Sequence, residues 1–317
     1  MDYRWLIGVL FLVSGCADPS AVTSFSVLTP DASKLHSLTA AYADAPNQLK
    51  ALDVLQNVTA MSVAETAAQV KARNDQIVQI DALHAVLVNY MQSLGALANN
   101  SLVQTSTDTK DVTDGLTALS TSLPALGLTS AMISGVGNIS TLLGDAATAA
   151  YRQDQLTTII GKSEVPFQQL IAAEKAIVTE GVIKELQNVE DRTRKLAEVT
   201  HALQVNANAE AKKSKPTTIM STGVDALDPK LQRSGAADIA SLYLLQQAIN
   251  SNLSILDLQI KAATAYVTAL DKISLAHTIL YKNRDNLLSK EGAQTALTQL
   301  TPLEKDASAA LKSLKNI

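Results

Sequence analysis

The chain has very little of the residues that build cofactor pockets and reactive thiol sites. Cys16 is the only cysteine among 317 residues, so no disulfide can form within one chain. Trp5 is the only tryptophan, and Phe25 and Phe167 are the only phenylalanines after the first 15 residues. Ligand pockets commonly have aromatic walls, so this scarcity argues against sugar, nucleotide or ring-cofactor binding. We expect no small-molecule cofactor.

The charges are also sparse and nearly balanced. The chain has 26 Lys and Arg against 30 Asp and Glu, a net charge of −4 at neutral pH. Nucleic-acid binding requires a strongly basic face, so nucleic acid is not an expected partner. The balance does not change when residues 1–15 are removed, because Asp2 and Arg4 cancel.

Motifs for catalysis or metal binding are missing as well. The four histidines, His36, His84, His201 and His277, are far apart in sequence and have no metal-type spacing. No GxSxG elbow, GxGxxG turn or P-loop occurs, and no carboxylate stands out as a paired acid and base in an apolar setting. His84 and His277 fall near apolar stripes, where we expect hydrogen-bonded histidines at the edge of a core. The sequence therefore predicts no metal site and no enzyme activity.

The N-terminus has the layout of an export signal. A short head with Arg4 precedes the apolar run "WLIGVLFLV", and the small residues Ser14 and Gly15 precede Cys16. The run is too short to span a bilayer as a permanent helix, which needs about 20 residues. The stretch "LVSGC", residues 12–16, resembles the lipobox of bacterial lipoproteins.

This resemblance implies cleavage between Gly15 and Cys16 and attachment of diacylglycerol to the Cys16 sulfur. With Cys16 lipidated, no free thiol remains for catalysis or metal binding. In enteric lipoproteins an Asp directly after the cysteine marks retention in the inner membrane, but Ala17 holds that position here. The resemblance thus implies an outer-membrane lipoprotein that faces the periplasm.

The rest of the chain divides by composition. Residues 1–15 are the predicted signal peptide, and residues 16–30, rich in Ser and Thr with Pro19 and Pro30, are predicted to be the lipidated cysteine and a tether. Residues 31–317 are predicted to form an elongated helical domain. A loop near 212–228 is a candidate internal boundary within it.

Helical periodicity recurs along this domain, and no strand-type alternation is present. Helices are expected from residue 29, with a kink or restart at Pro46, from the capping-box residues Ser62 and Glu65 to about 98, and over 108–122, 129–160, 164–213, 229 onward and 302–315. Breaks are expected at Pro124 and Gly127, and at "GKSEVP", residues 161–166. The fold class we predict is all-α, an elongated antiparallel helical bundle with several long helices.

Two of the predicted helices carry long apolar stripes. In the first, steps of three and four resemble a coiled-coil seam: Leu186, Val189, Thr193, Leu196, Thr200 and Leu203. The second stripe comprises Ile239, Leu242, Leu245, Ile249, Leu253, Leu256, Ile260, Ala263, Val267 and Leu270. Both patterns predict helix faces that pack on other helices.

Residues 115–144 contain no Asp, Glu, Lys, Arg or His. One interpretation is a membrane-active hairpin held between long helices, a layout that resembles the helical pore-forming toxins of the haemolysin E type. The other is a buried helical pair in a bundle. Nine of the 29 residues in 116–144 are Ser or Thr, and the leucines form a one-sided stripe, which favours the buried pair. The residues that test the choice are Leu119, Leu123, Val136 and Ile139.

The sequence thus predicts a membrane-tethered lipoprotein of the bacterial envelope that acts as a structural or protein-interaction module. Its expected partners are the membrane, through the lipid anchor, and another envelope protein. The alternative is a membrane-perturbing or pore-forming helical protein that uses residues 115–144.

Overall fold

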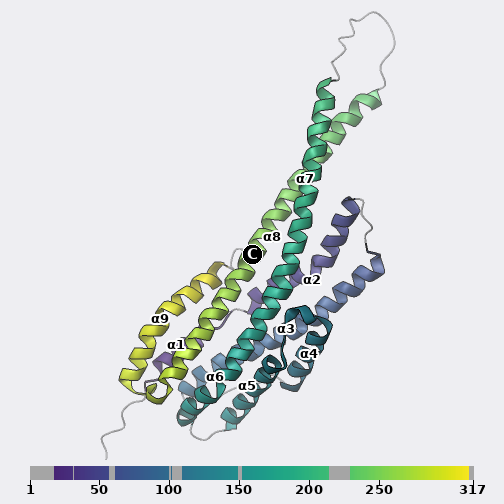
Figure 1. The fold of residues 1–317 in the computed structure, drawn as a ribbon. Helices are drawn as coiled ribbons and strands as arrows, with labels where there is room; N and C mark the ends of the chain where they lie inside the picture. Colours follow the sequence, from purple (N-terminus) through teal and green to yellow (C-terminus); the bar gives the residue numbers. More distant parts are fainter. Residues whose placement is uncertain are drawn as a thin grey trace, which may run out of the picture. The chain divides into compact units, whose positions relative to one another are not determined.

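A computed structural model of the chain describes residues 18–30, 32–56, 61–99, 101, 109–148, 152–213 and 229–313. These residues form helices and contain no strand, so the predicted all-α class and helical bundle are confirmed (Figure 1). The α-helices are α1 (Ser20–Ser26), α2 (Ala32–Leu55), α3 (Val63–Ala98), α4 (Thr109–Ser122), α5 (Ser130–Thr148), α6 (Arg152–Ala176), α7 (Lys184–Lys213), α8 (Pro229–Asn283) and α9 (Lys290–Ser313). Three short elements join them: the 3₁₀ turns η1 (Pro124–Leu126) and η3 (Arg284–Asn286), and the π-helical segment η2 (Ile177–Ile183).

The chain forms two compact units. Unit 1 contains Met1–His36, Gln76–Glu180 and Thr264–Lys315, and unit 2 contains Ser37–Asp75 and Gly181–Ala263. Three of the divisions fall inside the helices α2, α3 and α8, so each of these helices contributes to both cores. The loop near 212–228, our candidate boundary, lies within the sequence span of unit 2, and its residues 214–228 are outside the described part.

The N-terminal part of unit 1 is packed, which corrects the predicted tether. Val22 and Phe25 of α1 are fully buried, and the Phe25 ring lies 6.0 Å from Phe167, centroid to centroid. The Asp18 amide donates to the Leu288 carbonyl at 3.0 Å. Ala21, Val22, Phe25 and Leu28 have helical spacing. The stretch is short and rich in Ser and Thr, so its composition indicated a tether and its spacing was not recognised as a helix. Residues Ser20–Ser26 are therefore a helix that packs in the core of unit 1.

Three prolines lie inside helices of the structure. Pro46 lies inside α2, Pro166 inside α6 and Pro302 inside α9. The predicted break at 161–166 is thus wrong: α5 ends at Thr148, and the next helix starts at Arg152 and continues through Pro166. A proline removes one backbone hydrogen bond. Burial of neighbours such as Phe167 and Leu170, both fully buried, offsets that cost.

The last helix begins before the predicted residue 302. Ser289 precedes α9, and its hydroxyl accepts a hydrogen bond from the Gly292 amide at 3.1 Å. This contact satisfies one of the amides that have no partner within the first turn of a helix. The helix therefore starts at Lys290, and its Ala293, Ala296 and Leu300 are fully buried in unit 1.

The π segment η2 coincides with an irregular step in the buried stripe. Elsewhere along α6 and α7 the buried side chains mix steps of three and four, whereas Val178, Val182 and Leu186, which come after the buried Glu174 and Ile177, follow one another at steps of four. In an α-helix such a run turns away from the core, because four residues exceed one 3.6-residue turn. The wider π turn keeps these side chains buried.

In unit 2 the predicted seam of α7 is buried from Leu186 to Thr200. Its last member is different: Leu203 is 52 % exposed, and Gln204 is buried instead. Ion pairs join α7 to its neighbours, with Arg73 of α3 at 2.8 Å from Glu185 and Arg192 paired with Asp53 of α2. These contacts hold α2, α3 and α7 together beside the seam.

Candidate functional site

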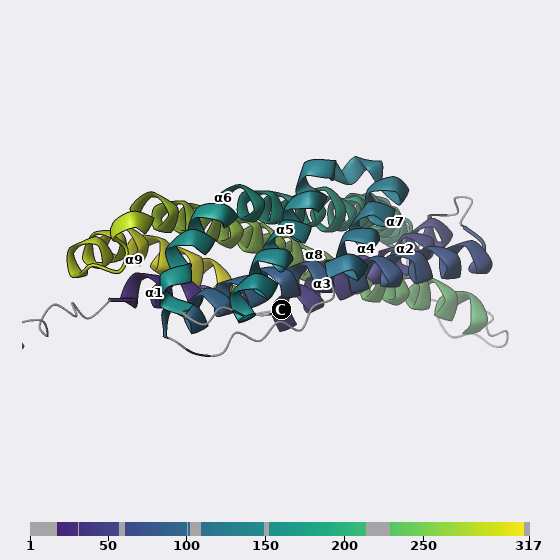
Figure 2. The same ribbon diagram turned by 90° about the horizontal axis from the view of Figure 1, so that it is seen from below.

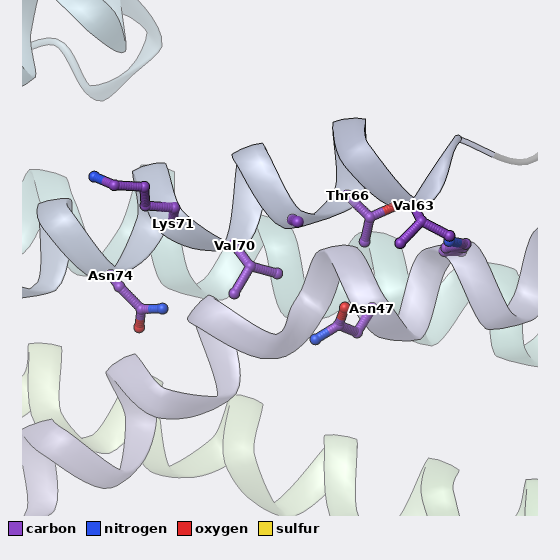
Figure 3. A pocket seen from close by; sticks show the side chains of 8 residues that line it. Asn47, Val63, Thr66, Val70, Lys71 and Asn74 are labelled. Atoms are coloured by element: carbon purple, nitrogen blue, oxygen red, sulfur yellow. The ribbon is translucent and has the colours of Figure 1, made fainter.

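An open groove lies between α2 and α3 of unit 2 (Figure 3). Its volume is about 440 Å³. The lining residues are Asn47, Lys50, Val63, Thr66, Ala67, Val70, Lys71 and Asn74. In Figure 3 Val63, Thr66 and Val70 of α3 are on the side toward Asn47 of α2.

A capping box fixes the end of α3 that opens the groove. The Ser62 amide donates to Glu65 Oε2 at 2.8 Å, and the Glu65 amide donates to Ser62 Oγ at 3.2 Å. This confirms the capping box predicted from the sequence. Because the helix begins at Val63, this side chain is held at the mouth of the groove, where it is 76 % exposed.

The polar groups of the groove are cationic or neutral. Lys71 pairs with Asp75 one helical turn away at 2.7 Å, and Asn47 donates to Asp44 at 3.0 Å. Lys50 forms no ion pair within the described part of the chain. No carboxylate, histidine or thiol is among the eight lining residues, so the groove suits binding, and it offers no nucleophile with a base. A ligand with an apolar group next to a carboxylate would match it.

A second candidate is a buried acid–base group in unit 1 that sequence reasoning missed. Glu174 of α6 is fully buried, and its Oε1 accepts hydrogen bonds from His84 Nδ1 at 2.7 Å and from the Tyr266 hydroxyl. Burial disfavours protonated His84, but the charge and hydrogen bond of Glu174, together with the charge of Asp81 and a hydrogen bond to the Pro30 backbone, favour it, and the pKa of His84 is raised. Our expectation that no carboxylate pairs with a base in an apolar setting is wrong.

A third group surrounds His277 of α8. His277 Nδ1 donates to Glu164 Oε2 at 2.7 Å, and Nε2 accepts from the Tyr90 hydroxyl at 2.6 Å. Burial lowers the pKa of His277 despite Glu164, so the imidazole is neutral at neutral pH. Burial works against ionisation of Glu164, but the hydrogen bonds that it accepts from His277, Thr278 and Gln168 favour the ionised form, and the pKa of Glu164 is lowered. The neutral ring stacks on Phe167 at 4.3 Å.

Ser163 completes an arrangement that resembles a catalytic triad in its distances. Its Oγ lies 3.3 Å from His277 Nε2, on the side of the ring opposite Glu164. However, Tyr90 occupies the same Nε2 at 2.6 Å, and Ser163, Tyr90 and His277 are all fully buried. A substrate cannot reach the Ser163 hydroxyl in this conformation. We read the group as a hydrogen-bonded part of the core, as expected for His84 and His277, although both lie deeper than the predicted core edge.

The residues of the uncharged segment 115–144 lie in α4, η1 and α5 of unit 1. Leu119, Val136 and Ile139 are buried, and Leu123, at the end of α4, is partly exposed. Gly127, with φ of 66°, makes the turn after η1. Figure 2 shows α4 and α5 next to each other. None of the helices in the described ranges is long and apolar enough to cross a membrane.

Neither the remaining predicted sites nor the comparisons with known proteins point to a related protein of known function. Gly15 and Cys16 lie outside the described residues. Across the described part of the chain, no three His, Cys, Asp or Glu side chains gather as metal ligands would. No protein-family model, curated protein or solved structure matches this chain.

Proposed function

We propose that the protein is a lipid-anchored module of the bacterial envelope that binds another envelope protein. The lipobox residues 12–16 support the anchor, and the absence of Asp after Cys16 supports the outer membrane, facing the periplasm. Asp18, the first described residue, lies in unit 1, where its amide donates to the Leu288 carbonyl. A single residue, Ala17, separates Cys16 from Asp18 in the sequence, so an anchor at Cys16 would hold unit 1 close to the membrane surface.

The observation that carries the binding role is the groove between α2 and α3 in unit 2. It combines apolar side chains, Val63 and Val70, with two lysines and no carboxylate. Electrostatic complementarity selects partners and steers their approach. We therefore propose that the partner inserts a segment with an apolar side chain flanked by Asp or Glu, which would contact Lys50.

Matched substitutions on α3 test this role. Val63, in the groove, and Val78, elsewhere on the same helix, are both highly exposed, at 76 % and 62 %. The partner is first captured by cross-linking in the envelope and identified, and its affinity for each variant is then measured. We expect Val63→Glu to weaken binding and Val78→Glu to leave it unchanged.

Lys50 allows a second test, which is based on charge. Lys50→Glu should weaken binding, Lys50→Arg should retain it, and added salt should reduce the affinity of the wild-type chain. Equal affinities of the Val63→Glu and Val78→Glu variants, with no effect of Lys50→Glu, would exclude the groove as the binding site. A partner segment without acidic residues would exclude the proposed chemistry.

A further inference from the structure

Two layers of polar side chains cross the apolar core of unit 1, and α3, α6 and α8 contribute to each of them. In the first layer, Glu174 of α6 accepts hydrogen bonds from His84 of α3 at 2.7 Å and from the Tyr266 hydroxyl of α8. All three side chains are at most 2 % exposed. We call these three residues the Glu174 layer, and it joins the three helices at one level of the bundle.

The second layer joins the same three helices at another level. Tyr90 of α3 donates to Nε2 of His277 in α8 at 2.6 Å, and its oxygen lies 2.5 Å from Oγ of Ser163 in α6. All three residues are fully buried, and we call them the His277 layer. The positions of Tyr266 and His277 in α8 separate the two layers by about 16 Å along this helix.

The apolar side chains around the layers repeat every seven residues, which is nearly two turns of an α-helix, so they are compatible with more than one alignment of the helices. Each layer residue has buried apolar equivalents seven or fourteen residues away on its own helix. For the Glu174 layer these are Ile77 and Met91 of α3, Ile160 and Phe167 of α6, and Ile273 and Leu280 of α8. For the His277 layer they are Leu83 and Leu97 of α3, Leu156 and Leu170 of α6, and Leu270 of α8.

Only the polar layers distinguish the native alignment from one that is shifted by seven residues. If α6 slipped by seven residues, Phe167 would take the place of Glu174, and both donors of that layer would face an aromatic ring. Leu156 would take the place of Ser163 in the same way. Buried charges and hydroxyls without partners are strongly unfavourable. The shifted alignment would therefore keep apolar contacts but lose every hydrogen bond between α6 and the other two helices in these layers.

We propose that the Glu174 and His277 layers select one register of α3, α6 and α8, whereas the apolar stripes supply the stability of unit 1. In coiled coils a single buried polar residue can fix the alignment of two helices at a cost in stability. Here two layers act on three helices. This role concerns unit 1 alone, so it does not depend on the groove of unit 2 or on the lipid anchor.

Cross-linking between α6 and α8 in the full chain reports the register. Lys175 of α6 pairs with Asp271 of α8 outside the core. A short bismaleimide should therefore join Lys175→Cys and Asp271→Cys in the native register. Thr264 is exposed and precedes Asp271 by seven residues, so Lys175→Cys should be joined to Thr264→Cys only after a slip. Mass spectrometry of the digested chain identifies the linked peptides, and single-cysteine variants control for Cys16.

Apolar replacements of similar size remove the layers. The Glu174 layer is replaced by His84→Leu, Glu174→Met and Tyr266→Phe, and the His277 layer by Tyr90→Phe, Ser163→Ala and His277→Leu. With one layer replaced, we expect the native cross-link alone, because the other layer still selects the register. With both replaced, we expect the Thr264 cross-link to appear beside the native one and the amide NMR signals to multiply. Helical circular dichroism should be retained, and the melting temperature should be no lower than that of the wild type.

A matched control replaces equivalent apolar positions and leaves both layers intact. Met91→Leu, Ile160→Met and Ile273→Leu together should give the native cross-link alone and a single set of amide signals. A chain without either layer that behaves like this control would overturn the proposal. Loss of helix or a lower melting temperature on replacement of both layers would also overturn it, because the layers would then supply stability and not alignment.

Discussion

Two buried histidines in unit 1 have the same type of partner, yet their pKa values shift in opposite directions. His84 lies against Glu174, and its pKa is raised; His277 lies against Glu164, and its pKa is lowered. The difference lies in the second ring nitrogen and its surroundings. His277 Nε2 accepts a hydrogen bond from Tyr90, which requires a neutral ring, and its face stacks on Phe167. A neighbouring carboxylate therefore does not by itself decide whether the pKa of a histidine is raised or lowered.

The His277 group predicts a defined pH dependence of stability. The pKa of His277 is lower in the folded chain than its ordinary value of 6.5, so the unfolded chain binds the proton first as pH falls. The free energy of unfolding should therefore decrease as pH drops below 6.5 toward the folded-state pKa. His84, with a raised pKa, contributes the opposite trend, losing stability as pH rises through its folded-state pKa.

Denaturant unfolding of wild type and His277→Gln between pH 5 and 8 isolates this contribution. The variant should be less stable at neutral pH, because the hydrogen bonds to Glu164 and Tyr90 are lost. The difference in the free energy of unfolding between wild type and variant should become smaller toward low pH. His201→Gln, at an exposed position of α7, should follow the wild-type profile. A difference in the free energy of unfolding that grows as pH falls would contradict the neutral state of His277.

At the scale of elements, the uncharged segment 115–144 has two possible roles, as part of a core or as a membrane-active hairpin. Val136 and Ile139 are fully buried in unit 1, and the Ser and Thr hydroxyls of α4 and α5 bond to backbone carbonyls of their own helices, as Thr117 does to Thr113 at 2.8 Å. Membrane entry would require these helices to leave the core. The buried pair is thus the arrangement that the structure contains, and the pore-forming alternative stays a prediction.

Val136→Asp should lower the melting temperature in plain buffer, because it buries a charge without a partner at a cost of several kcal/mol. Ser134→Asp, on the exposed side of α5, is the matched control and should melt like the wild type. Thermal unfolding followed by circular dichroism measures both. Unchanged melting of the Val136→Asp variant, combined with loss of a wild-type ability to permeabilise liposomes, would favour the pore-forming role.

Sequence patterns predicted the elements better than the contacts between them. The α7 stripe as far as Thr200, the capping box at Ser62 and the turn at Gly127 follow from local spacing, and the structure contains them. Of the predicted α8 stripe, Ile249, Leu256, Ala263 and Leu270 are buried. The helix continues through Pro166 because its neighbouring side chains are buried by distant segments. A proline in the local sequence gives no information about that burial. The pairs His84–Glu174 and His277–Glu164 join residues 90 and 113 positions apart, so no local motif marks them. Apolar stripes did mark His84 and His277, and Glu174 carries the same signal, since it falls between Ile171 and Ile177.

At the scale of the whole molecule, the anchor predicts where the protein is found. The wild-type chain should fractionate with membranes and incorporate labelled fatty acid at Cys16. Cys16→Ala should block processing and leave residues 1–15 attached. Normal processing of this variant, without fatty-acid label on the wild type, would refute the lipoprotein assignment.

The elongated shape inferred from helix lengths stays a prediction for solution scattering. A compact chain of about 300 residues has a radius of gyration near 19 Å. We expect a larger value for the processed protein, and a value at or below that figure would refute the elongated bundle.

The π segment at Ile177–Ile183 also has a consequence for the ancestry of the chain. In a regular α-helix, two successive steps of four residues would rotate the buried stripe by about 80°. A single inserted residue produces such a run, and a widened turn absorbs it without disturbing the helix on either side. A relative that is one residue shorter between Glu174 and Leu186 should therefore have an unbroken α-helix here. Alignments that place a one-residue gap in this stretch would date the insertion within the lineage.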